Sequence, residues 1–149
     1  LATSDTYTST HPKNVVGIDF SDTIDTSKRY VDILRNEEQV DLVIALTHVG
    51  LEQSTAIAEN VAGIDLIVDG HSHSLLSHGR MVQDTLIVQA NDYTKYLGMV
   101  EIVLDDGEVS MDARLIPAEE IKERYQQDEV IVEMIDEFSD EITKMLLGF

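Results

Sequence analysis

The strongest constraint on the fold of this chain is an alternation of short apolar stretches with helix-like stretches between residues 15 and 68. The apolar stretches have the length and β-branched content of strands and occupy residues 15–20, 40–46 and 64–68. The helix-like stretches have apolar residues every three or four positions. The first follows candidate N-caps at residues 25–27, and the second occupies residues 51–61. Strands alternating with helices predict an α/β sheet in which parallel strands are joined by crossover helices. The run at residues 40–46, interrupted only by Asp41, predicts a strand buried on both faces.

The second half of the chain changes pattern. Three further strands are expected, at residues 85–90, 96–104 and 108–116. Asp105, Asp106 and Gly107 separate the last two, and an Asp-Gly pair between strands predicts a tight hairpin. The nearly continuous apolar run at residues 99–104 predicts burial on much of both faces. An amphipathic helix is expected between the candidate N-cap Asp128 and the candidate C-cap Gly148, which precedes Phe149.

Composition narrows the class of function. The 149 residues include 29 Asp and Glu against 10 Lys and Arg, which gives a formal net charge of −19. A domain this acidic repels phosphate backbones, so we expect no binding to a nucleic-acid polymer. The chain has no cysteine, which excludes disulfides, thiol catalysis and cysteine-bound metals. No apolar run reaches the ~18 residues that a transmembrane helix needs.

Histidines follow two of the expected strands at the point where each strand ends. His48 comes just after residues 40–46, and His71 and His73 come just after residues 64–68. Because the carboxyl ends of parallel strands joined by a crossover helix meet at the same sheet edge, we expect these three side chains to converge. Neutral imidazole is a good ligand for zinc, manganese, iron and nickel. The placement therefore predicts metal ligation rather than three unrelated polar loop residues.

The rest of a hydrolytic metal centre is not found in the sequence. His11 and His78 are isolated in polar loops, and we expect them to bind no metal. A dinuclear centre usually needs a carboxylate that bridges its ions, and no Asp or Glu lies at a matching strand end with a His or Asn beside it. Asp41 is near the start of its strand, and Asp69 is better placed as an outer partner of a ligating imidazole. The chain therefore supplies half of a metal site.

Two segments resemble the calcineurin-like metallophosphoesterases. Residues 41–50 end in Thr-His-Val-Gly, and residues 63–73 end in Gly-His-Ser-His. More narrowly, they resemble the 5′-nucleotidase branch, which includes UDP-sugar hydrolases and 2′,3′-cyclic-nucleotide phosphodiesterases. Further agreement lies at residues 14–18, 86–90 and 93–98, although residues 90–93 depart from the more usual Ala-Gly. The resemblance implies an α/β fold that is part of a four-layer αββα sandwich followed by an amphipathic linker helix.

The resemblance also implies roles for the three histidines. His48 and His71 would ligate one ion, and His73 would ligate the other, in a pair of divalent metals such as zinc or manganese. The family's earlier Asp-x-His, Gly-Asp and Gly-Asn-His-Asp/Glu segments, which supply the other ligands, are absent from these residues. We therefore expect residues 1–117 to be the C-terminal half of a catalytic domain. Residues 118–149 are expected to be a linker helix toward an absent C-terminal nucleotide-binding domain.

Two classes of function remain open at this stage. In the first, the parent protein is a metal-dependent phosphoric ester hydrolase of nucleotides or other small phosphoesters, and the isolated chain is inactive. In the second, the domain keeps the fold and serves as a non-catalytic surface, adhesion or binding module. In either case we expect self-association or pairing with the missing N-terminal half, because strands at the cut edge lack partners. The resemblance favours an extracellular, cell-wall or periplasmic location.

Overall fold

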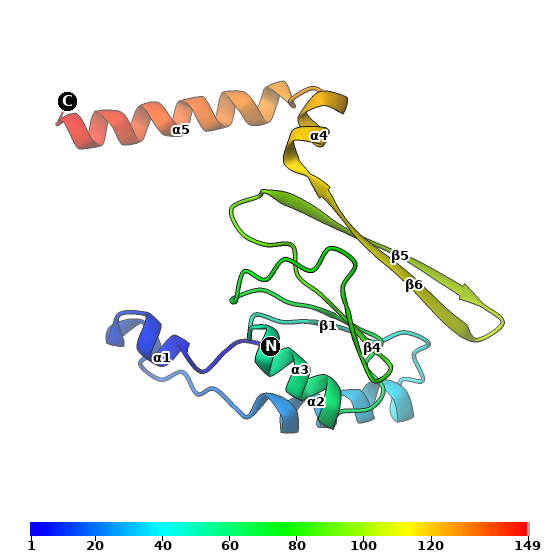
Figure 1. Cartoon of the computed structure of the whole chain (residues 1–149). Coiled ribbons are helices and arrows are strands. Elements are labelled where there is room, and N and C mark those ends of the chain that lie inside the picture. Colours follow the sequence, from blue (N-terminus) through cyan, green and yellow to red (C-terminus); the bar gives the residue numbers. More distant parts are fainter. Residues whose placement is uncertain (149) are drawn as a thin grey trace. The chain divides into compact units, whose positions relative to one another are not determined.

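The computed structural model describes residues 1–148 (Figure 1). The chain divides into two compact units, Leu1–Ile116 and Pro117–Phe149. The helices are α1 (Thr6–Ser9), η1 (Pro12–Val15), α2 (Thr23–Asp32), η2 (Ile33–Glu37), α3 (Leu51–Asn60), α4 (Ala118–Arg124) and α5 (Glu129–Leu147). The strands are β1 (Ile44–Leu46), β2 (Leu66–Val68), β3 (Arg80–Val82), β4 (Thr85–Val88), β5 (Tyr96–Asp105) and β6 (Glu108–Pro117).

The first unit is built on a four-stranded sheet with the order β1-β2-β4-β3. Neighbours β1 and β2 are parallel, with Leu46 opposite Val68, and β2 is parallel to β4. Strand β3, which the sequence pattern did not reveal, runs antiparallel to β4. The predicted crossover is confirmed, because α3 connects β1 to the parallel β2. The two strands therefore end at the same edge of the sheet.

Helices α2 and α3 cover one face of this sheet (Figure 1). Ile57 of α3, Ile67 of β2 and Ile87 of β4 are fully buried between the layers. Burial of an isoleucine side chain contributes about 1.5–3 kcal/mol relative to exposure, so these residues anchor the helices to the sheet. Strand β1 is different, since Ile44 is 49% exposed and Leu46 is 74% exposed. The prediction that this strand is buried on both faces is wrong, because β1 is an end strand of the sheet. Among residues 1–148 its outer edge meets the start of the chain, where the Leu1 ammonium donates to the Leu46 carbonyl (2.8 Å) and Ala2 bridges to His48.

The segment at residues 15–20 is not a strand. Val15 ends η1, Gly17 has a φ of 76°, and Val16 and Ile18 are exposed. The backbone around Phe20 is instead held by a side chain, because the Tyr7 hydroxyl donates to the Ile18 carbonyl (3.0 Å) and accepts from the Phe20 N–H (3.1 Å). The strand prediction failed here because a strand needs a neighbour, and this segment has none in the described part of the chain.

The helix that follows starts earlier than its pattern predicted. Asp22 is the N-cap of α2, and its carboxylate accepts from the Asp25 N–H at 2.9 Å. The predicted caps at residues 25–27 therefore lie inside the helix. The short β1, β2 and β4 lie within their expected segments, and α3 matches its expected range apart from its last residue.

Strands β5 and β6 form a separate two-stranded ribbon. The hairpin prediction is confirmed, with φ values of 47° at Asp106 and 86° at Gly107. The ribbon packs on the sheet through Ala113, which joins Leu66 and Leu86 in a second apolar cluster. Its other side is open, since Leu97, Met99, Val103 and Leu104 are exposed, so the prediction of burial on both faces of β5 is wrong. Helices, sheet and ribbon make a layered α/β arrangement, which agrees with the expected fold class.

The second unit contains α4 and α5. The Asp128 carboxylate caps α5 by accepting from the Val130 and Ile131 N–H groups, and Gly148 ends it in the left-handed conformation. The amphipathic helix is thus confirmed, and no residue of α5 is buried. The helix was predicted to end at Gly148-Phe149, and Phe149 lies outside the described residues. Among residues 1–148, none of the helices combines the length and apolar character that spanning a bilayer requires.

Candidate metal centre

The two loops at the ends of β1 and β2 bring His48 and His71 together. Their ring centroids are 5.2 Å apart, with an interplanar angle of 67°. The strand pairing explains this proximity, since the Thr47 N–H continues the ladder by donating to the Val68 carbonyl (2.9 Å). His48 is exposed and the side chain of His71 is 34% exposed, so both rings are open to solvent. The expected convergence is confirmed for this pair.

A buried carboxylate lies beneath the pair and ties the two loops together. Asp69 Oδ1 accepts hydrogen bonds from the Thr47 hydroxyl (2.8 Å) and from the N–H groups of Val49 (3.0 Å) and Gly50 (3.3 Å). Burial alone would raise the pKa of Asp69, but the bonds from Val49 and Thr47 outweigh it, and the pKa is lowered from its ordinary value. The expectation that Asp69 would be the outer partner of an imidazole is not met by its hydrogen bonds, which go to Thr47, Val49, Gly50 and Gln89. Asp69 fixes the loop that carries His48 instead.

Gln89, directly after β4, holds the other histidine loop. Its buried amide nitrogen donates to Asp69 Oδ2 (2.8 Å) and to the Gly70 carbonyl (3.1 Å). Its amide oxygen accepts from the Ser72 hydroxyl (3.1 Å) and from the Ser74 N–H. Sequence reasoning assigned no role to Gln89. The available signal was a polar residue at the end of an apolar strand, on the edge where His48 and His71 also lie.

Two glycines allow the loops to approach. A Cβ atom on Gly70 would lie 2.9 Å from His48 Nδ1, closer than side chains tolerate. Gly50 has a φ of 86°, and a Cβ there would contact the His71 ring at 3.4 Å. Glycine at both positions therefore leaves space for the two rings on a tightly folded backbone.

The Gly-His-Ser-His loop itself has an uncommon backbone. His71 has a φ of 78° and His73 a φ of 53°, both in the left-handed region. Such conformations cost about 1–3 kcal/mol in residues other than glycine and are found most often at functional sites. Between them, the Ser72 hydroxyl accepts from the Leu51 N–H (3.0 Å) and so ties the loop to the start of α3. The loop is thus restrained on both sides.

His73 has different neighbours from the other two histidines. Its Nδ1 lies 3.7 Å from Asp92 Oδ2, and its ring lies edge-on to that of Tyr93 with centroids 6.1 Å apart. The carboxylate nearest to His71 Nε2 is instead Asp5, at 3.5 Å. Within residues 1–148, no set of three His, Asp or Glu side chains is arranged to hold one ion. The structure therefore unites His48 with His71 but does not gather all three.

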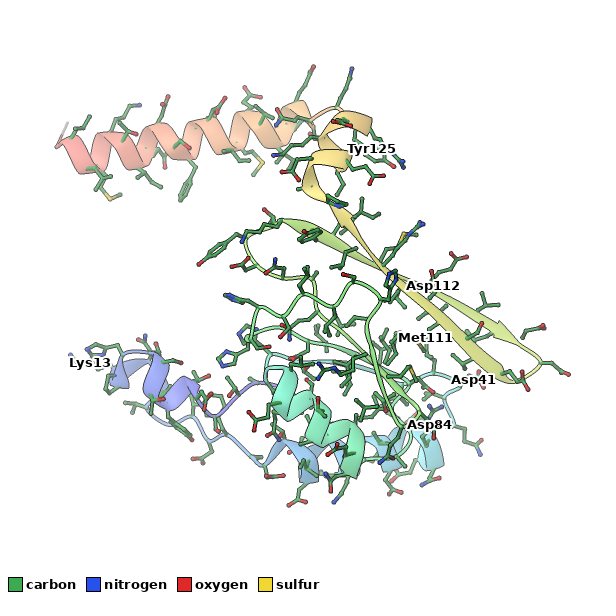
Figure 2. The ribbon with its side chains drawn as sticks, in the orientation of Figure 1. Lys13, Asp41, Asp84, Met111, Asp112 and Tyr125 are labelled. Atoms are coloured by element: carbon green, nitrogen blue, oxygen red, sulfur yellow. The ribbon has the colours of Figure 1, made fainter. Side chains whose placement is uncertain are left out.

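The other histidines and the aspartate considered in the sequence are not part of the His48–His71 loops. Asp41 precedes β1, as expected, and is labelled in Figure 2 together with Asp84 and Lys13. His11 accepts from the Lys13 N–H through Nδ1 (3.2 Å), and His78 lies exposed before β3. No ion pair to an acidic residue is found for His11 or His78 in the described part of the chain, and neither lies with the His48–His71 pair.

Comparisons with known proteins indicate the class of protein to which the chain belongs. No family model matches the chain. It is 33% identical over 147 residues to the "Trifunctional nucleotide phosphoesterase protein YfkN" of Bacillus subtilis, covering 95% of this chain and 10% of that protein. It is 31% identical over 147 residues to a 5′-nucleotidase of Vibrio cholerae, covering 78% of this chain and 27% of the relative. The chain thus spans about a quarter or less of the length of these curated relatives.

A solved structure shows the same fold. A putative 5′-nucleotidase from Staphylococcus aureus superposes with a TM-score of 0.76 over 94% of this chain and 30% of that one, at 18% identity. Sequence and fold together place the chain among the calcineurin-like metallophosphoesterases. Within them it belongs to the 5′-nucleotidase family.

Proposed function

We propose that the protein is a metal-dependent phosphoric ester hydrolase of nucleotides, with two divalent metal ions. His48 and His71 ligate one ion and His73 ligates the other. Residues 1–117 form the C-terminal half of the catalytic domain, and residues 118–149 form the linker toward a C-terminal nucleotide-binding domain. Support comes from the nucleotidase relatives and from the convergence of His48 and His71 at one sheet edge.

The chemistry of the donor set fits a cation. Imidazole nitrogens suit zinc, manganese and related ions. Asp69, directly before the histidine loop, is a buried carboxylate whose hydrogen-bond donors are all uncharged: a hydroxyl, an amide side chain and backbone N–H groups. No cationic side chain bonds to it in the described part of the chain. A buried negative charge without a cationic partner favours positive charge nearby. The single observation that carries the proposal remains the convergence of His48 and His71 at one sheet edge.

The chain's own residues would position the ligands. Asp69 and Gln89 fix the two loops, and His48 and His71 present their rings from those loops. A bound pair of ions would lower the pKa of a water molecule and balance the charge on the phosphoryl oxygens. The other ligands, including the bridging carboxylate, would come from a segment outside these 149 residues. We accordingly expect the isolated chain to be inactive.

Two further proposals concern the binding partner of strand β1 and the location of the protein. The outer edge of β1, which within residues 1–148 meets the start of the chain only near Leu46, would pair with the missing half or with a second copy, because an open strand edge attracts another strand. Ile44 and Leu46, which are exposed, would be covered by that partner. Sedimentation of the isolated chain is expected to show self-association, and a monodisperse monomer would contradict this. Relatives named 5′-nucleotidase also support an extracellular, cell-wall or periplasmic location.

The direct test is phosphate release from AMP by the protein together with its preceding segment. His71→Ala is expected to abolish most of the turnover, because one ion loses a ligand. His78→Ala is the matched control, since this histidine is exposed and lies just before β3, outside the two loops that carry His48 and His71. Turnover unchanged in His71→Ala would contradict the proposal.

A further inference from the structure

The loop after β4 holds a carboxylate beside His73. Asp92 Oδ2 lies 3.7 Å from His73 Nδ1, and the Asp92 side chain is only 17% exposed. The other carboxylate oxygen, Oδ1, accepts a hydrogen bond from Lys95 Nζ at 2.7 Å. Lys95 also lies over the Tyr93 ring, 5.8 Å from its centroid, and Tyr93 contacts the His73 ring. The carboxylate is therefore held between a cation and the imidazole.

The backbone of this loop is fixed in an uncommon shape. Three of its residues have positive φ: Asn91 (66°), Tyr93 (50°) and Thr94 (55°). The Lys95 N–H closes a turn on the Asp92 carbonyl (3.1 Å), and the Asn91 N–H donates to the Ser74 carbonyl (3.1 Å). The second bond ties this loop to the residue that follows His73. A strained turn that is restrained in this way keeps Asp92 in place.

We propose that Asp92 is a positioning residue that keeps the proton of the His73 ring on Nδ1 and leaves Nε2 free for a metal ion. This inference rests on the proposed role of His73 as a ligand. Ligating histidines commonly donate their second N–H to a carboxylate, which fixes the tautomer and the ring orientation. The present separation of 3.7 Å is too long for a hydrogen bond, so the proposal requires the ring, whose side chain is 55% exposed, to move closer to Asp92.

The tautomer of His73 can be read by nitrogen NMR of the imidazole rings in the 149-residue chain without metal. The spectra are recorded at about pH 8.5, about two units above the pKa of a model-peptide imidazole. We expect the Nδ1–H form in the natural chain and a shift toward the Nε2–H form, which free histidine prefers, in Asp92→Ala. Asp92→Asn retains an acceptor oxygen and is expected to lie between them. Asp84→Asn, an exposed change in the turn between β3 and β4, is the control (Figure 2).

Zinc titration of the protein together with its preceding segment, from which the other proposed ligands come, gives a second readout. The Zn²⁺ concentration that half-saturates the His73 ring signals is expected to rise about 10–100-fold in Asp92→Ala. An unchanged tautomer or an unchanged midpoint in Asp92→Ala would overturn the proposal. If the His73 signals of that longer protein, unsubstituted, do not respond to Zn²⁺ at all, the proposed role of His73 as a ligand is contradicted. The tautomer, measured without metal, then still decides whether Asp92 holds the ring.

Discussion

The two ends of the β1–β2 pair are each tied together by an aspartate, but in different ways. At the amino end, Asp65 pairs with Arg35 and accepts from the Val43 N–H (2.7 Å). The Arg35 guanidinium also donates to three backbone carbonyls there. At the carboxyl end, Asp69 is buried and has only uncharged donors. The aspartate at the amino end is therefore neutralised by an arginine, whereas the aspartate at the carboxyl end has no cationic partner among residues 1–148. His48 and His71 lie at the carboxyl end, beside the negative charge that is not neutralised.

The largest expected effect is at the carboxyl end. Asp69→Ala removes the acceptor for the Thr47 hydroxyl and for the Val49 and Gly50 N–H groups, which are left buried without partners. We expect a loss of about 3 kcal/mol in the free energy of unfolding, measured by urea denaturation. Asp69→Asn keeps one acceptor oxygen and should lose less. Equal stability of Asp69→Ala and the natural chain would contradict the role of this carboxylate.

The pH dependence of stability should also show the contribution of Asp69 at the carboxyl end of the β1–β2 pair. The pKa of Asp69 is lowered in the folded state from 3.8, so its contribution is fully present above pH 3.8 and is lost as the pH falls through the lower, folded value. Urea midpoints measured at a series of pH values across this window should fall on acidification. The fall should be smaller in Asp69→Asn, which has no carboxylate to protonate. Parallel curves for the two proteins would contradict this assignment.

The amino end should respond less to substitution. Arg35→Lys keeps the positive charge but loses the planar guanidinium that reaches Asp65 and the backbone carbonyls at once. Both partners are about a quarter exposed, which weakens the ion pair. We expect a loss of about 1 kcal/mol in the free energy of unfolding. A loss larger than that of Asp69→Ala would reverse the proposed ranking of the two ends.

The smallest expected change in stability comes from Gly70→Ala. The added Cβ would meet His48 Nδ1, and the exposed ring can turn away at a cost below about 1 kcal/mol. The ring would then leave its place beside His71, so metal affinity should fall although the fold persists. Gly107→Ala, at the β5–β6 turn, adds a Cβ that meets nothing within 4 Å and leaves the histidines untouched. Equal metal affinity in both variants would show that the spacing of His48 is unimportant.

Much of this arrangement followed from local sequence patterns. The proximity of His48 and His71 was predictable because crossover topology alone decides where parallel strands end. The role of Gln89 was not, because its bonds to Asp69 and Ser74 join residues distant in sequence. The separate surroundings of His73 depend on left-handed backbone that no pattern in the sequence indicates.

Two of the errors in the fold share one physical cause. The apolar sequence of residues 15–20 predicts a strand, and that of residues 40–46 predicts a strand buried on both faces. In the described residues the first segment has no neighbouring strand and β1 has one on only one side, so the first segment is irregular and Ile44 and Leu46 are exposed. An apolar pattern predicts that a segment can form a buried strand. Whether the strand forms and is buried depends on neighbouring strands and helices that the pattern does not specify.

The central claim is that His48 and His71 share a metal ion. Anomalous diffraction at the zinc edge, from crystals of the protein soaked in Zn²⁺, tests it most directly. We predict one peak about 2.1 Å from a ring nitrogen of each histidine, absent in His71→Ala and retained in His78→Ala. Zinc bound only elsewhere, or a peak between these loops that persists in His71→Ala, would contradict the account.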